Sequence, residues 1–96
     1  MKALRFHPEA ERELVSAQIW YEKRSEVAAQ AFALELDKAI HRILESPQTY
    51  PMGRRGERRF ILERFPYTIL YRTEDDDVFV TAVAHHSRRP DYWRHR

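Results

Sequence analysis

The 96-residue chain has no cysteine, only two glycines and no long apolar run. Without cysteine there is no disulfide framework, no thiolate zinc site and no cysteine nucleophile. No apolar stretch approaches the ~18–20 residues that cross a bilayer, and Arg5, His7 and Glu9 interrupt the place where a signal peptide would have its apolar core. We therefore expect one soluble, cytoplasmic domain over residues 1–96, with no membrane partner.

An excess of charge of either sign is also lacking, since the formal net charge is only +2. The distribution is uneven, however: residues 1–51 hold seven Lys and Arg against eight Asp and Glu, and residues 52–96 hold ten against seven. All ten cations of the second half are arginine. Arginine binds phosphate or carboxylate bidentately, so this bias is compatible with nucleic acid or with an acidic protein partner. A genome rich in arginine codons would produce the same bias.

The first half predicts a short strand followed by two helices. Residues 2–6 alternate as a strand does, and Pro8 with the acidic Glu9 and Glu11 is typical of a helix start. This helix should run to about residue 24 and the next from 26 to 45, with Ser25 as N-cap between them. Two stripes at helical spacing predict the buried faces. They are Ala10, Leu14, Ala17 and Tyr21, flanked by Ile19 and Trp20, and then Ala29, Phe32, Ala33, Leu36, Ile40 and Ile43.

The second half predicts three strands, over residues 59–64, 67–72 and 78–84. The run 74–77 is acidic and reads as a solvated hairpin turn, because it lacks the glycine and the distal glutamate of a calcium loop. We expect no metal and no cofactor. The order of elements predicts an α+β domain in which a short N-terminal strand and an α-helical hairpin precede a three-stranded antiparallel meander, with both helices on one face. The edge that the first strand joins stays open.

The last strand continues directly into a tail that is rich in arginine, histidine and aromatic residues, 85–96. Such a tail is either a solvated end or a surface that meets phosphate or an acidic protein. Arg88 and Arg89 could instead pair with the acidic turn, and Tyr92 and Trp93 could pack over the sheet edge. Tyr67 and Tyr71 share a strand face, which favours the core for both.

Four blocks in this order are similar to those of a known family. They are Pro8-Glu9-Ala10 with Leu14 and Trp20-Tyr21; Ala31-Phe32 with Leu36; the block 66–72; and the block 83–93. The chain resembles the RelE/ParE superfamily of toxins from bacterial type II toxin–antitoxin modules. The resemblance implies a partner antitoxin with an amphipathic segment, which we expect to be acidic. It also implies one of two activities: RelE-like members cut messenger RNA on the ribosome, and ParE-like members poison DNA gyrase.

Messenger RNA cleavage would need a base for the 2′-hydroxyl, cations for the phosphorane and an acid for the leaving oxygen. The candidates for these catalytic roles are His85, His86, Arg59, Arg72 and Tyr92. Two features depart from the RelE-like pattern, which has a basic residue where Thr68 stands and a second cation where Ile61 stands.

These departures favour a ParE-like toxin that binds gyrase. The alternatives are a ribosome-dependent endoribonuclease and a degenerate, non-toxic interaction domain. On the favoured interpretation, the candidates for contact with the target or partner are Arg58, Arg64, Arg88, Arg89 and Trp93.

Overall fold

The protein forms the predicted succession of one strand, two helices and three strands. The computed structural model describes residues 3–96, so position 2, where the first strand was expected to begin, lies outside the described residues. The elements are β1 (Leu4–Phe6), α1 (Pro8–Arg24), α2 (Glu26–Glu45), β2 (Arg58–Ile61), β3 (Tyr67–Glu74) and β4 (Asp77–His85). The α+β fold class is thereby confirmed. No helix within residues 3–96 is both long and apolar enough to cross a membrane.

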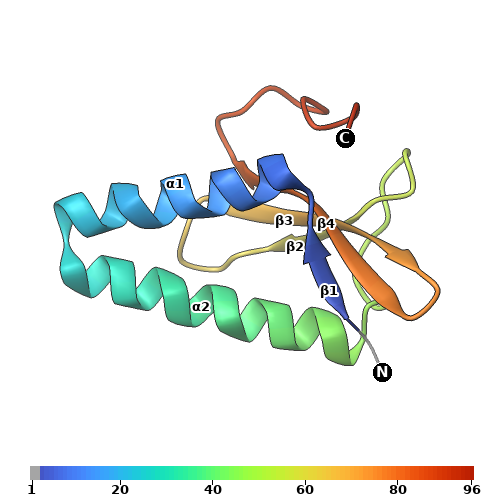
Figure 1. Ribbon diagram of the computed structural model, residues 1–96, viewed down its shortest axis with the longest axis horizontal. Coiled ribbons are helices and arrows are strands. Elements are labelled where there is room, and N and C mark those ends of the chain that lie inside the picture. Colours follow the sequence, from blue (N-terminus) through green and yellow to red (C-terminus); the bar gives the residue numbers. More distant parts are fainter. Residues whose placement is uncertain (1–2) are drawn as a thin grey trace.

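The helices form an antiparallel hairpin, which Figure 1 shows along its length. Pro8 occupies the first turn of α1, where a missing N–H costs nothing. Ser25 joins the helices: its N–H donates to the Tyr21 carbonyl oxygen at 2.8 Å, and its Oγ accepts the Ala28 N–H at 3.2 Å. One residue therefore ends α1 and caps α2, as the sequence predicted.

The sheet has the order β1-β4-β3-β2. Strands β2, β3 and β4 form the predicted antiparallel meander. β1 joins the β4 edge in parallel, from Leu4 opposite Val78 to Phe6 opposite Val80, so the sheet is mixed. This placement leaves the second half of β4 without a neighbouring strand on the β1 side.

The prediction that the first strand of the meander continues to residue 64 is wrong, because β2 ends at Ile61. The chain turns there, and the N–H groups of Glu63 and Arg64 donate to one carboxylate oxygen of Glu35, at 2.7 and 3.2 Å. The Glu35 side chain of α2 thus accepts the backbone hydrogen bonds that a neighbouring strand would otherwise accept. The sequence indicated no contact between these segments.

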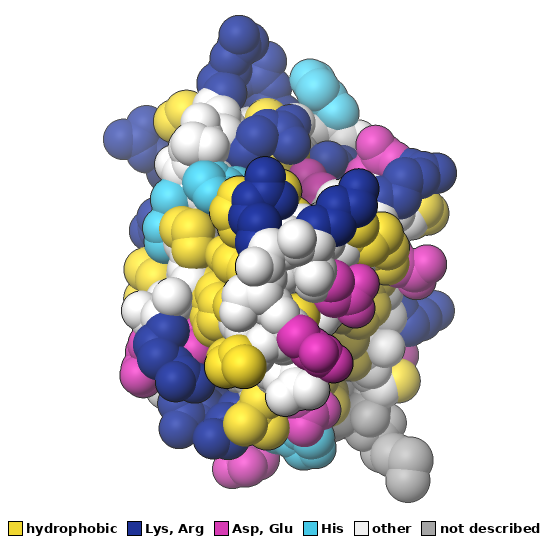
Figure 2. Space-filling view, turned by 90° about the vertical axis from the view of Figure 1, so that its left-hand side faces the viewer, with side chains coloured by type: hydrophobic (Ala, Val, Ile, Leu, Met, Phe, Trp, Pro, Cys, Tyr) yellow, Lys and Arg dark blue, Asp and Glu magenta, His cyan; other side chains and the backbone are white. Residues whose placement is uncertain are grey.

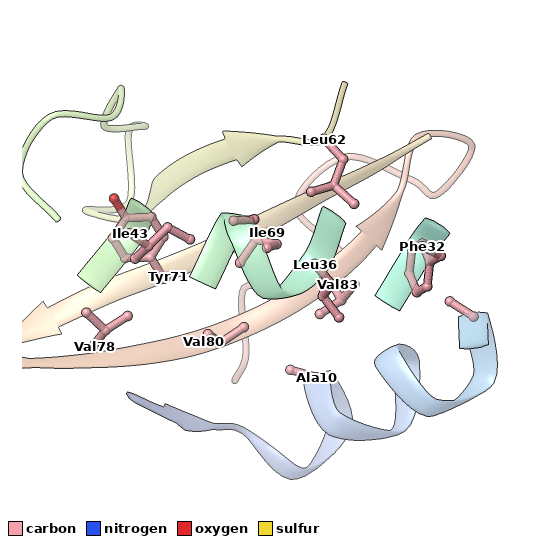
Figure 3. Close-up of a cluster of buried hydrophobic side chains, with 12 residues drawn as sticks. Ala10, Phe32, Leu36, Ile43, Leu62, Ile69, Tyr71, Val78, Val80 and Val83 are labelled. Carbon is pink, nitrogen blue, oxygen red and sulfur yellow. The ribbon is translucent and has the colours of Figure 1, made fainter. Parts of the chain in front are cut away.

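The main core lies between the helices and one face of the sheet. Figure 3 shows Phe32, Leu36 and Ile43 of α2 beside residues of β3 and β4. Most of the predicted helical stripe is confirmed, but Ala33 is exposed and Ala39 is buried instead. The buried positions follow the spacing 29, 32, 36, 39 and 43, which keeps one face centred on the sheet.

A bulge in β4 determines which of its side chains face the helices. Leu70 pairs with Ala82 but Tyr71 pairs with Val80, so Thr81 is an extra residue on β4. Val80 and Val83 therefore both belong to the helix-side core, and the small side chain of Ala82 faces the other side of the sheet. The free face consequently has a shallow apolar area, which the end of the chain covers.

Candidate functional site

Residues 86–96, called here the C-terminal segment, are irregular in conformation but fixed by packing. Trp93 is only 8% exposed and forms a second apolar cluster with Leu70 and Ala82 on the face away from the helices. Asp91 turns the chain with a φ of 60°. Figure 2 shows Lys and Arg side chains gathered at the top of the molecule, the end where Figure 1 places this segment. Trp93, predicted to contact a partner, thus supports the segment from beneath.

The segment is anchored by one carboxylate of α1, that of Glu13. Tyr92 donates its hydroxyl to Glu13 Oε2 at 2.6 Å, and Arg96 donates to both carboxylate oxygens, at 2.9 and 3.1 Å. Arg88 lies 3.8 Å from the same group, with its guanidinium stacked 3.8 Å from the centre of the Tyr92 ring. The carboxylate also accepts the Val83 N–H at 2.9 Å. These contacts hold the segment against both α1 and β4.

This environment raises the pKa of the Tyr92 hydroxyl above its ordinary value. Burial is the main cause, and the hydrogen bond to Glu13 and its negative charge add to it, whereas Arg88 and Arg96 act in the opposite direction. Tyr92 is therefore a protonated donor at neutral pH whose proton already points at a carboxylate. In this arrangement its hydroxyl stabilises the segment.

A cleft of about 300 Å³ lies beside the place where the segment packs on the free face of the sheet, and its lining includes most of the residues that the sequence singled out. Its lining includes Arg59, Thr68, His85, His86, Arg88, Arg89, Tyr92 and Trp93. The lining also includes the carboxylates of Glu57 and Asp91, but its arginines and imidazoles have the chemistry to bind a phosphate or a carboxylate. Arg89 and Arg59 have no ion-pair partner within residues 3–96, which leaves their guanidinium groups available to a ligand.

Both predicted histidines are engaged in local hydrogen bonds. His85 Nδ1 accepts the Ser87 N–H at 3.0 Å and lies 2.8 Å from Ser87 Oγ. His86 Nε2 lies 3.0 Å from the hydroxyl of Thr68. The Thr68 hydroxyl stands where the RelE-like pattern has a basic residue that would hold a phosphate. The cleft therefore has less positive charge than RNA cleavage by that pattern requires.

Three predicted arginines lie away from this cleft. Arg72 lies along the sheet, with its guanidinium 5.5 Å from the centre of the Phe79 ring. Arg58 donates to the carbonyl oxygens of Gln48 and Tyr50, at 3.1 and 2.8 Å, and so fixes the loop before β2. The third, Arg64, pairs with Glu35 of α2 at 3.3 Å. Arg58 and Arg64 are therefore engaged in structural contacts in the free protein.

The alternative in which Arg88 pairs with the acidic turn is not observed, since Arg88 contacts Glu13 and Asp77 of that turn contacts Arg5. Sequence reasoning missed Glu13 altogether. A signal was present: Glu13 falls between Ala10 and Ala17, beside Leu14, at the margin of the buried stripe. A carboxylate in that position needs a partner. Within residues 3–96, no group of three or more His, Cys, Asp or Glu is placed to hold a metal ion.

Solved structures share this architecture. A chromosomal ParDE toxin–antitoxin system from P. aeruginosa superposes with a TM-score of 0.72 and 17% identity, covering 88% of this chain and 96% of that one. The isolated RelE toxin of E. coli gives a TM-score of 0.61 and 22% identity, covering 97% and 93%. At these identities the likeness concerns the fold alone. No curated protein sequence matches the chain significantly.

The sequence itself assigns the branch. The family model described as "ParE toxin of type II toxin-antitoxin system, parDE" matches residues 4–90, nearly the whole chain. The chain belongs to the ParE toxin family, and the predicted RelE/ParE resemblance, with its preference for the ParE-like branch, is confirmed.

Proposed function

We propose that this protein inhibits growth by binding DNA gyrase and that a cognate antitoxin neutralises it. The ParE family match over residues 4–90 supports a toxin of this class. The observation that favours binding over RNA cleavage is the state of Tyr92, whose hydroxyl is committed to Glu13 at 2.6 Å. A tyrosine held in this way is poorly placed to transfer a proton to or from a substrate.

The binding surface would be the outer side of the C-terminal segment, where Arg89 and Arg94 are exposed and have no ion-pair partner within residues 3–96. The sequence predicted an acidic antitoxin segment, and the arginines of residues 52–96 supply the complementary charge. The groove between α1 and α2 offers a different surface: its apolar residues include Leu14, Ile19 and Ile40, and its rim carries Glu22 and Asp37. The acidic part of an antitoxin segment would therefore lie on the arginine side.

A ribosome-dependent endoribonuclease is the second candidate, and one observation favours it. The 300 Å³ cleft places Arg59, His85 and His86 beside one another, as a phosphate-binding proton-transfer site would require. A degenerate domain that only binds a partner is the third candidate.

Induction of the protein without its antitoxin distinguishes these candidates. We expect growth to slow, gyrase-linked DNA breaks and the DNA-damage response to increase, and messenger RNA to stay intact. Codon-positioned cuts in translated messages, detected by primer extension, would show the endoribonuclease instead. Normal growth in cells that contain folded protein would indicate the degenerate domain.

A further inference from the structure

The second half of β4 has an edge that no strand covers. β1 pairs with β4 only as far as Val80, although β4 continues to His85. Two side chains take the place of a strand there: Glu13 accepts the Val83 N–H at 2.9 Å, and Arg96 donates to the Thr81 carbonyl oxygen at 3.2 Å. Peptide groups on an uncovered edge need such partners when they are buried.

The same two side chains are paired with each other and are nearly buried. Arg96 and Glu13 form a bidentate pair, and their side chains are 14% and 15% exposed. Arg96 belongs to the C-terminal segment and Glu13 to α1, so the pair that closes the sheet edge also attaches the segment to the domain. Tyr92 adds its hydroxyl to the same carboxylate.

The start of the segment is held by His86, whose N–H donates to the Pro66 carbonyl oxygen at 2.8 Å and whose Nε2 lies 3.0 Å from the Thr68 hydroxyl. Trp93 packs on the free face of the sheet, and Arg55 lies 3.9 Å from Asp91 in an exposed pair that contributes little. Removal of the Glu13 carboxylate would leave the Tyr92 hydroxyl and the Val83 N–H without their partner, and it would leave the Arg96 guanidinium with only the Thr81 carbonyl oxygen. The helix-side core, in contrast, does not include Glu13.

We propose that Glu13 is the positioning residue of the recognition surface. This nearly buried carboxylate of α1 orders the C-terminal segment, so that Arg89, which has no partner within residues 3–96, is held toward the target. The inference rests on the proposed function, because the segment must meet a target for its order to matter. Glu13 itself lies beneath the segment and need not touch the target.

The test compares Glu13→Ala and Glu13→Gln with Glu11→Gln as the matched control. Glu11 is an exposed glutamate of the same helix, and its side chain has no polar contact within residues 3–96. Order of the segment is measured by the rate of tryptic cleavage after Arg88 and Arg94. It is also measured by the emission of Trp93 in a Trp20→Phe background, which removes the other of the two tryptophans. These measurements do not depend on toxicity.

We expect cleavage of the Glu13→Ala protein to be faster by roughly tenfold or more, and Trp93 emission to shift to the red, as the segment opens locally. Glu13→Gln should fall between, because its single amide oxygen can still accept from Val83, whereas the amide nitrogen in place of Oε2 no longer accepts from Tyr92 and the ion pair with Arg96 is lost. Toxicity should be lower in Glu13→Gln than in the wild type, and lowest in Glu13→Ala. Glu11→Gln should behave as the wild type. If Glu13→Ala does not fold, the same cleavage, emission and toxicity measurements are made on Glu13→Gln and Tyr92→Phe instead.

A double variant tests whether Glu13 and Arg96 hold the segment through the same contact. If Glu13 acts through the segment, then adding Arg96→Gln to Glu13→Gln should increase cleavage by less than the product of the single effects. Unchanged cleavage and emission in both Glu13 variants would overturn the proposal, and so would full toxicity with an opened segment. A wild-type protein that does not inhibit growth would refute the proposed function, and the cleavage series would still decide whether Glu13 orders the segment.

Discussion

Arg88 and Arg89 are adjacent in the chain, but their side chains have different environments. Arg88 stacks on the Tyr92 ring and lies near Glu13, whereas Arg89 is exposed and lines the cleft without an ion-pair partner within residues 3–96. The first arginine therefore helps to hold the segment, and the second is free to bind. Sequence alone gives the two residues equal weight.

Substitution of each arginine by alanine should separate these roles. Arg89→Ala should abolish toxicity while the free energy of unfolding changes by less than about 0.5 kcal/mol. Arg88→Ala should also lose the stacking contact, which costs about 0.5–1 kcal/mol at an exposed site and lowers Tm by a few degrees. The measurements are a growth assay and a thermal melt.

The control for this pair is Arg54→Ala, which removes an exposed arginine from the loop before β2. It should leave toxicity and Tm as they are. If Arg89→Ala remains fully toxic, the exposed side of the segment is not the recognition surface.

At the scale of elements, the turn between α1 and α2 is centred on Ser25. Ser25 has extended backbone angles, and its Oγ caps the α2 N-terminus through the Ala28 N–H. A second tie is the Gln18 amide, which donates to the Ala29 carbonyl oxygen at 3.1 Å. The close return of α2 along α1 thus follows from local chemistry that the sequence displays.

Ser25→Ala should destabilise the protein by about 1 kcal/mol, because the first turn of α2 loses its side-chain acceptor. Ser16→Ala is the control and should stabilise the protein slightly. Ser16 is exposed in the interior of α1, where alanine is the better helix former. We expect urea denaturation to give changes of opposite sign for the two variants. Equal effects would show that capping does not determine the turn between α1 and α2.

At the scale of the whole molecule, buried phenols couple stability to alkaline pH. Burial raises the pKa of Tyr71 to about 12, and its hydroxyl donates to the Pro47 carbonyl oxygen at 2.7 Å. Burial also raises the pKa values of Tyr21, Tyr67 and Tyr92. Because the folded protein favours the neutral phenol, this contribution is complete below pH ~10 and is lost as the pH rises through the folded pKa values.

The free energy of unfolding should therefore fall between pH ~10 and 12. Ionisation of Tyr71, which is fully buried, should account for about 2–3 kcal/mol of this decrease. Tyr71→Phe should be less stable at neutral pH by about 1 kcal/mol, for the lost hydrogen bond. Its stability should also decline less steeply above pH 10. Denaturation curves of both proteins across this range provide the measurement, and parallel declines would contradict the assignment to Tyr71.

The sequence by itself determined the order and nature of the elements, because these depend on neighbours within a few residues. Pro8, Ser25 and the helical spacing of Phe32, Leu36 and Ile43 mark the hairpin, and alternation marks the meander. The superfamily resemblance and the candidate residues that line most of the cleft could also be predicted, since the block 83–93 includes the end of β4 and the residues that follow it.

The tertiary structure alone decided the contacts that cross the chain. Glu13 and Val83 are 70 positions apart, and Glu13 and Arg96 are 83 apart, so no periodicity or cap connects them. The bulge at Thr81 and the parallel place of β1 likewise depend on how the sheet packs on the helices. A buried carboxylate must find partners wherever the fold brings them, and this requirement fixed the C-terminal segment.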